Sequence, residues 1–141
     1  MTTLTSTTQA IQWLENLNAE YKVCIQWNVE VPFKGAYSHD QGKILVSSLV
    51  TREEEKLEVL LHETVHMLQR HEGLFEAYLS EDGEEIYLTT VNLFFPAQEW
   101  KDFLANYIRK DGYNWLIEVG AFFLQSEYHW FREWYDNTIL L

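Results

Sequence analysis

The chain has 141 residues, of which 47% are hydrophobic and 16% aromatic, so it can build the core of one domain covering residues 1–141. Ten basic residues stand against 22 acidic ones, and the net charge of -12 repels nucleic-acid phosphates and anionic membrane surfaces. The single cysteine, Cys24, excludes an internal disulfide, and the N-terminus has neither the basic nor the apolar region of a secretion signal. We therefore expect a soluble, cytoplasmic protein that binds neither nucleic acid nor membrane.

The first third of the chain predicts one helix followed by three strands. Residues 8–20 carry apolar side chains at helical spacing, which predicts a helix. Residues 22–31 alternate apolar and polar side chains, as in a half-buried strand. Residues 36–38 and 43–47 flank a turn that contains Gly42, and this arrangement predicts a hairpin.

The rest of the chain is predicted to be mostly helical. Residues 51–54 (Thr-Arg-Glu-Glu) form a capping box that opens a helix reaching about Arg70. Residues 74–95 predict a short strand, an acidic turn and a second apolar segment. Pro96 opens another helix, and a last long helix is expected over residues 113–134. The order of elements predicts an α+β fold.

The chemistry of the chain is concentrated in the pattern H-E-x-x-H inside the helix after residue 51. His62 and His66 are four residues apart, so both imidazoles point from one face of a helix and can share one metal ion. Glu63 lies about 100° round the helix, where its carboxylate can take a proton from a metal-bound water. The pattern therefore predicts a metal-dependent hydrolase.

The surrounding helix is apolar on most of its sides, with a continuous stripe at Leu57, Leu61, Val65 and Leu68. A helix of this kind is mostly buried, so the two histidines are not expected to be idle surface residues. The alternative is a pair of core histidines bonded to backbone or carboxylate groups. We favour metal binding over that alternative.

A catalytic zinc site needs a third protein ligand. A metzincin would place a glycine and a histidine where this chain has Gln69 and Glu72, and His71 is one position off. Glu118 stands in an apolar stretch, where a lone carboxylate is costly unless it pairs with a metal or a cation, or is protonated. His129 is roughly 16 Å further along a continuous helix, too far for the same ion. Glu118 is the predicted third ligand.

The stretch Leu60-Leu-His-Glu-Thr-Val-His66 and the later Glu118-Val-Gly-Ala121 resemble the gluzincin zinc metallopeptidases. Among these, the chain is most similar to the compact ImmA/IrrE-like peptidases and the minigluzincins. The resemblance implies a compact zincin-like domain with a small antiparallel or mixed sheet, an H-E-x-x-H helix and a C-terminal glutamate helix. Phe122 departs from the pattern, because larger gluzincins carry Asp there.

The resemblance also implies how the site works. Zn2+ would be bound by His62, His66 and Glu118, and Glu63 would activate the bound water. An extended peptide would pair with an edge strand, expected at residues 43–47. The donor to the oxyanion stays open among four candidates: Tyr107, Tyr113, Tyr128 and His129.

The main hypothesis is a zinc endopeptidase of narrow specificity that acts on a protein or peptide. The alternatives are a catalytically silent zincin-fold protein that binds or regulates a partner, and a hydrolase of non-peptide amides. The intact Glu63 favours an enzyme.

The apolar end of the tail, residues 136–141, is expected to cover the cleft in a latent form. The acidic residues between 53 and 85 predict an exposed, solvated face.

Overall fold

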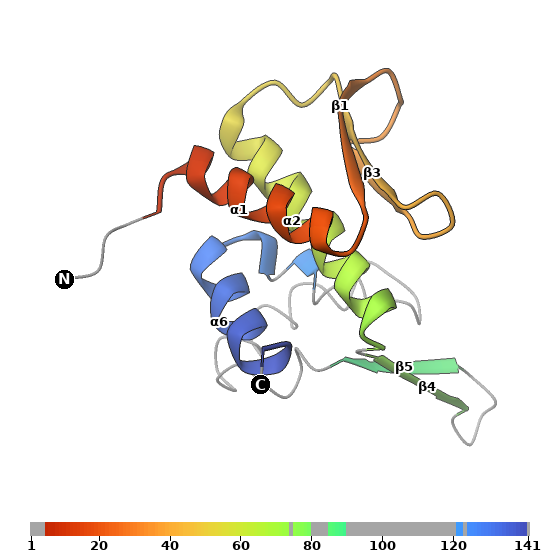
Figure 1. Ribbon diagram of the computed structural model, residues 1–141. Coiled ribbons are helices and arrows are strands. Elements are labelled where there is room, and N and C mark those ends of the chain that lie inside the picture. The colour runs from red at the N-terminus through yellow and green to blue at the C-terminus, as the bar shows by residue number, and fades with distance from the viewer. Residues whose placement is uncertain (1–4, 74, 80–84, 90–120, 123, 141) are drawn as a thin grey trace. The chain divides into compact units, whose positions relative to one another are not determined.

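The computed structural model describes residues 5–73, 75–79, 85–89, 121–122 and 124–140 (Figure 1). Contacts divide the chain into two compact units, Met1–Met67 and Leu68–Leu141. The boundary falls inside helix α2 (Glu53–His71). The two units are described separately, and a single domain over residues 1–141 stays a prediction.

The first unit is α+β. It contains helix α1, a three-stranded mixed sheet and most of α2, in the chain order α1 (Thr7–Glu20), β1 (Cys24–Val29), β2 (Gly35–Ser38), β3 (Lys43–Ser47) and α2. The strand order in the sheet is β1-β3-β2. Strand β3 lies in the centre, where it pairs parallel with β1 and antiparallel with β2.

Helix α1 confirms the prediction for residues 8–20 and begins one residue earlier. Ser6 caps it: the Gln9 N–H donates to Ser6 Oγ at 3.1 Å, and the Ser6 N–H donates to Gln9 Oε1 at 3.1 Å. This reciprocal pair satisfies two backbone donors that a helix start leaves without partners. The face that α1 buries is formed by Ala10, Ile11, Leu14, Leu17 and Asn18.

Strand β1 confirms the predicted alternation but is shorter than residues 22–31. Ile25 and Trp27 are half-buried, whereas Gln26 and Asn28 between and beyond them are exposed. Asn28 has a φ of 58°, and the pairing with β3 shifts register between Gln26 and Val29. This left-handed residue bends the chain out of the ladder before Pro32.

The hairpin β2–β3 is confirmed, with Gly42 at a φ of 62° in its turn. The expectation that residues 43–47 form an edge strand is wrong, because β3 pairs on both sides. Its consecutive apolar residues, Ile44-Leu-Val46, include two fully buried side chains, Ile44 and Val46. A continuous apolar run of this kind is typical of an interior strand.

Helix α2 begins at Glu53, later than the predicted capping box. The first helical bond runs from the Lys56 N–H to the Arg52 carbonyl at 2.9 Å, so Arg52 rather than Thr51 takes the cap position. The carboxylates of Glu53 and its two acidic neighbours lie in the first turn, where they interact favourably with the positive end of the helix dipole. Beyond the end of α2, Gly73 has a φ of 60°, as predicted for a helix stop.

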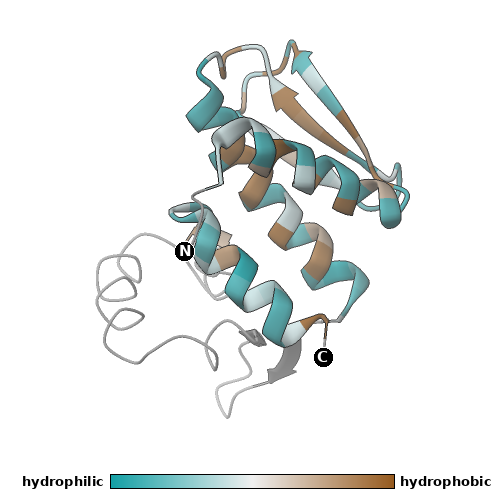
Figure 2. Cartoon of the chain, turned by 60° about the vertical axis from the view of Figure 1, so that its left-hand side comes forward, coloured by the Kyte–Doolittle hydropathy of each residue, from teal (hydrophilic) through white to brown (hydrophobic). Residues whose placement is uncertain are grey.

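Hydrophobic residues are distributed along the helices of the first unit as brown bands between teal polar ones (Figure 2). In α2 nearly every side chain from Val59 to Gln69 is buried, and His66 is half-buried. The expectation of a largely buried motif helix is therefore confirmed.

The second unit contains an antiparallel pair, β4 (Phe75–Leu79) and β5 (Glu85–Thr89). Strand β4 confirms the short strand predicted within 74–95, and β5 lies in the stretch that was predicted only as a turn and an apolar segment. It also contains helix α6 (Tyr128–Thr138). The helix predicted from Pro96 lies outside the described residues. No helix in the described part of the chain is long and apolar enough to cross a membrane.

The prediction of one continuous helix over residues 113–134 is wrong in its C-terminal part, where the helix is interrupted. Residues 121–122 and 124–125 are helical, but Glu127 is extended, with a φ of -143° and a ψ of 118°, and α6 starts after it. The distance between Glu118 and His129 thus no longer follows from helical rise. The predicted tail also changes, because α6 continues to Thr138 and takes up half of residues 136–141.

Candidate metal centre

Three residues of the predicted site lie together on α2, within the first unit. His62 and Glu63 are each 9% exposed, and His66 is half-buried. Burial of three polar side chains on one helix is costly unless they have partners or a ligand. The motif is therefore part of the interior of the protein.

The two imidazoles converge through the same type of ring nitrogen. His62 Nε2 and His66 Nε2 are 3.1 Å apart, and the rings meet edge to face at 78° with centroids 4.8 Å apart. Two nitrogens on a tetrahedral zinc ion, each about 2.05 Å from it, are separated by roughly 3.4 Å. A shift of a few tenths of an ångström would bring the pair to that separation, so the two residues fit the metal.

The same separation allows one neutral imidazole to donate its N–H to the other when no metal is held. The two rings therefore form a preformed pair in either state. For both Nε2 atoms to hold a metal, the donating imidazole would have to carry its proton on Nδ1 instead, because a ligating histidine is neutral and binds through the nitrogen without a proton.

Helix α1 fixes the motif helix from its buried side. The Asn18 side chain donates from Nδ2 to Thr64 Oγ1 at 3.1 Å and to the Leu14 carbonyl at 2.9 Å. Asn18 and Thr64 are fully buried, and Thr64 directly follows Glu63. The link opposes rotation of α2 at the motif. Sequence reasoning missed it, although a lone asparagine on the apolar face of α1 is a detectable signal.

Strand β2 approaches α2 closely at the motif. A Cβ atom on Gly35 would lie 2.5 Å from Val59 Cγ1 and 3.4 Å from Glu63 Cγ. Only glycine allows this contact, since real Cβ atoms do not come so close to another carbon. Gly35 thus brings the start of β2 beside the motif glutamate.

Strand β2 is an edge of the sheet that the structure describes. The Ser47 N–H donates to the Lys34 carbonyl at 2.9 Å, so these two residues form a hydrogen-bonded pair of the antiparallel ladder, and every second residue of β2 after Lys34 does the same. With this pairing the backbone N–H and C=O groups of Gly35 and Tyr37 point away from β3. The groups of Gly35 lie at this edge beside Glu63.

Tyr37 is a second residue that sequence reasoning missed. It lies on the same face of β2 as Gly35, because strand side chains alternate with a period of two. Its hydroxyl is 2.8 Å from His39 Nδ1, and the two rings meet edge to face. No signal in the sequence pointed to it, because the approach of Gly35 to the motif joins distant segments of the chain.

The remaining predicted site residues are either outside the described residues or in the second unit. Glu118, Tyr107 and Tyr113 lie outside the described residues. Tyr128 and His129 begin α6 in the second unit; the Tyr128 hydroxyl accepts from Arg132 Nη1 at 3.2 Å, and His129 Nδ1 is 3.7 Å from Glu127 Oε2. Within the described ranges no three His, Cys, Asp or Glu side chains gather to hold a metal.

Comparison of the chain with protein-family models, with curated proteins and with solved structures finds no match.

Proposed function

We propose that this protein is a zinc-dependent metallopeptidase of the gluzincin type. The observation that carries the proposal is the convergence of His62 Nε2 and His66 Nε2 at 3.1 Å on a buried helix, with the buried Glu63 beside them. A buried imidazole pair next to a carboxylate matches the ligand and base positions that H-E-x-x-H chemistry requires.

His62 and His66 would hold the metal through Nε2, and Glu118 stays the predicted third ligand. Zinc in such a site acts as a Lewis acid and makes water a nucleophile at neutral pH. The Glu63 carboxylate accepts a proton from the attacking water and then donates it to the nitrogen of the leaving amine. Burial of Glu63 keeps bulk water from competing for this proton.

The substrate would be an extended peptide added to the edge of the sheet. Gly35 directs its backbone N–H and C=O away from β3, so an extended peptide would pair with β2 there as a further strand. Because Gly35 lies against Val59 and near Glu63, this pairing would bring the peptide backbone next to the motif. Strand β2 therefore takes the role first expected for residues 43–47.

The oxyanion donor remains a prediction, with Tyr107, Tyr113, Tyr128 and His129 as candidates. We add Tyr37, since it shares the face of β2 with Gly35; its hydroxyl meets His39 Nδ1 at 2.8 Å and would have to turn from that contact to reach an oxyanion. Replacement of the true donor by a residue without the hydroxyl or N–H should lower kcat about 10²–10³-fold with little change in zinc content.

Glu63→Gln tests the proposal, because it keeps the shape of the side chain and removes the base. We expect full zinc content and an unchanged fold, with peptide cleavage reduced about 10²–10⁴-fold. The measurement is mass spectrometry of a broad peptide library, with a chelator as a second control. Glu58→Gln is the matched variant, because Glu58 is exposed on the same helix.

The outcome also separates the enzyme from its alternative. Cleavage that persists at the wild-type rate in Glu63→Gln would contradict the assigned base. Zinc binding without cleavage of any peptide would favour a catalytically silent zincin-fold protein that binds or regulates a partner.

A further inference from the structure

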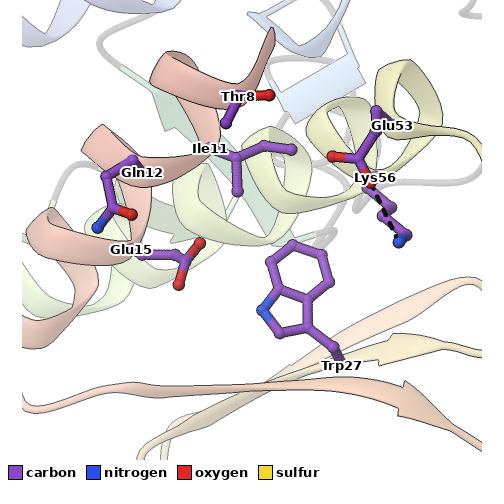
Figure 3. A pocket seen from close by; sticks show the side chains of 7 residues that line it. All are labelled: Thr8, Ile11, Gln12, Glu15, Trp27, Glu53 and Lys56. Carbon is purple, nitrogen blue, oxygen red and sulfur yellow. Dashed lines mark hydrogen bonds and ion pairs between the residues drawn. The ribbon is translucent and has the colours of Figure 1, made fainter.

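A pocket separate from the motif lies in the first unit, between α1, Trp27 of β1 and the first turn of α2 (Figure 3). Its volume is about 220 Å³. Pockets for drug-sized ligands occupy roughly 300–1,000 Å³, so this one has room for a single side chain or a similarly small group. Lys56 lines it six residues before His62, roughly 9 Å along the helix axis from the motif.

One wall of the pocket is aromatic and another is acidic. The Trp27 indole rises from β1 toward the helices, and the Glu15 carboxylate on α1 is directed into the same space (Figure 3). Glu15 is half-buried, and among the described residues no donor or cation pairs with its carboxylate. An aromatic face beside a carboxylate is an arrangement that attracts cations.

The other charged groups of the pocket compensate each other. Lys56 Nζ is 3.2 Å from Glu53 Oε1, which leaves the ammonium paired within its own helix. Glu15 is therefore the uncompensated charge in the lining. The net charge of -12 on the chain adds to the attraction of a cation and disfavours an anion.

We propose that this pocket binds an alkylguanidinium group, as in an arginine side chain, stacked on Trp27 with Glu15 as its counter-ion. A guanidinium is planar, matches a carboxylate with two parallel N–H donors and stacks on an indole, whereas an ammonium makes only point contacts. The alkyl stem would lie against Ile11, the apolar residue of α1 in the lining. The inference goes beyond the proposed peptidase activity and does not depend on it.

The test is a titration followed by NMR on the full chain. The indole N–H signal of Trp27 is assigned by its absence in Trp27→Phe. Acetylarginine methylamide should shift this signal saturably at low salt, and the neutral citrulline analogue should not. Glu15→Gln should weaken binding at least about tenfold, because a charged hydrogen bond is lost. Glu20→Gln, at the exposed end of the same helix, is the matched control and should bind as wild type.

A second arm distinguishes the source of the guanidinium. A peptide with one central arginine that binds more tightly than the amino-acid derivative indicates a protein partner, whereas equal affinity indicates a small molecule. An equal shift with the citrulline analogue, an unchanged affinity in Glu15→Gln, or no shift at all would overturn the proposal. Thermal unfolding verifies that each variant is folded, and repetition with a chelator present separates this result from the zinc site.

Discussion

At the scale of single residues, the two imidazoles carry the clearest chemical information in the chain. His62 and His66 meet through their Nε2 atoms on a largely buried helix, where His62 is 9% exposed and His66 is half-buried. If the pair holds zinc, the loss of either imidazole removes the metal, whereas a pair of structural histidines would have no metal to lose.

His62→Ala and His66→Ala should each abolish stoichiometric zinc, because a single imidazole with one carboxylate does not hold the ion. Elemental analysis of the purified variants measures this directly. His71→Ala, at the exposed end of the same helix, should retain zinc. Full retention of zinc in the variant with both His62→Ala and His66→Ala would contradict the predicted metal site.

Glu118→Gln tests the predicted third ligand. Glutamine keeps the shape but loses the anionic ligand, so we expect weaker zinc binding in a chelator competition by a protein that is still folded. The opposite result, unchanged zinc affinity with lower stability, would mean that Glu118 is only a salt-bridge partner in the core.

At the scale of secondary-structure elements, the contact between β2 and α2 places an edge of the sheet beside the motif. Gly35 makes this contact possible, since any larger residue would meet Val59. The strand and the helix are held at a separation that has no room for a methyl group.

Gly35→Ala should therefore destabilise the protein by about 1–3 kcal/mol, the usual cost of overpacking. In a Val59→Ala background, which removes the methyl groups that the new Cβ would meet, the same substitution should cost less. Urea unfolding of the four proteins in this cycle gives the coupling. Equal costs in both backgrounds would show that the helix is not the obstacle.

Local patterns in the sequence were sufficient for several elements. The helix at residues 7–20, the hairpin around Gly42 and the burial of the motif helix all follow from spacing along one segment. The central position of β3 was missed, because strand order depends on pairing between distant segments. The break at Glu127 was missed for a different reason: no glycine or proline marks it, and apolar residues continue on both sides.

The same limit applies to the candidate site. Both histidines and Glu63 are recognisable because one helical turn contains them. The link from Asn18 to Thr64 and the approach of Gly35 join residues that are 46 and 28 positions apart, and a single sequence does not reveal such contacts.

At the scale of the whole molecule, charge is the dominant feature. Residues 53–85 contain eleven acidic and two basic residues, a net of -9 out of -12 for the chain. Such a field attracts cationic ligands and repels anionic ones over distances of about a Debye length, which is roughly 10 Å at 0.1 M salt.

If the protein is a peptidase, kcat/KM for a peptide with added lysines should exceed that of the same peptide with added glutamates, and the ratio should fall as salt increases from 50 mM to 0.5 M. Initial rates at low substrate concentration measure this ratio. A ratio that does not change with salt would assign the preference to local contacts instead.

The edge position of β2 has a consequence for the behaviour of the protein in concentrated solution. A strand at the edge of a sheet can pair with the edge of another copy, which is the first step toward aggregation. The strand has only four residues, and the strongly negative surface keeps copies apart at neutral pH. Near the sequence pI of about 4.7 that repulsion disappears. The short length of β2 is then what limits pairing between the sheet edges of two copies.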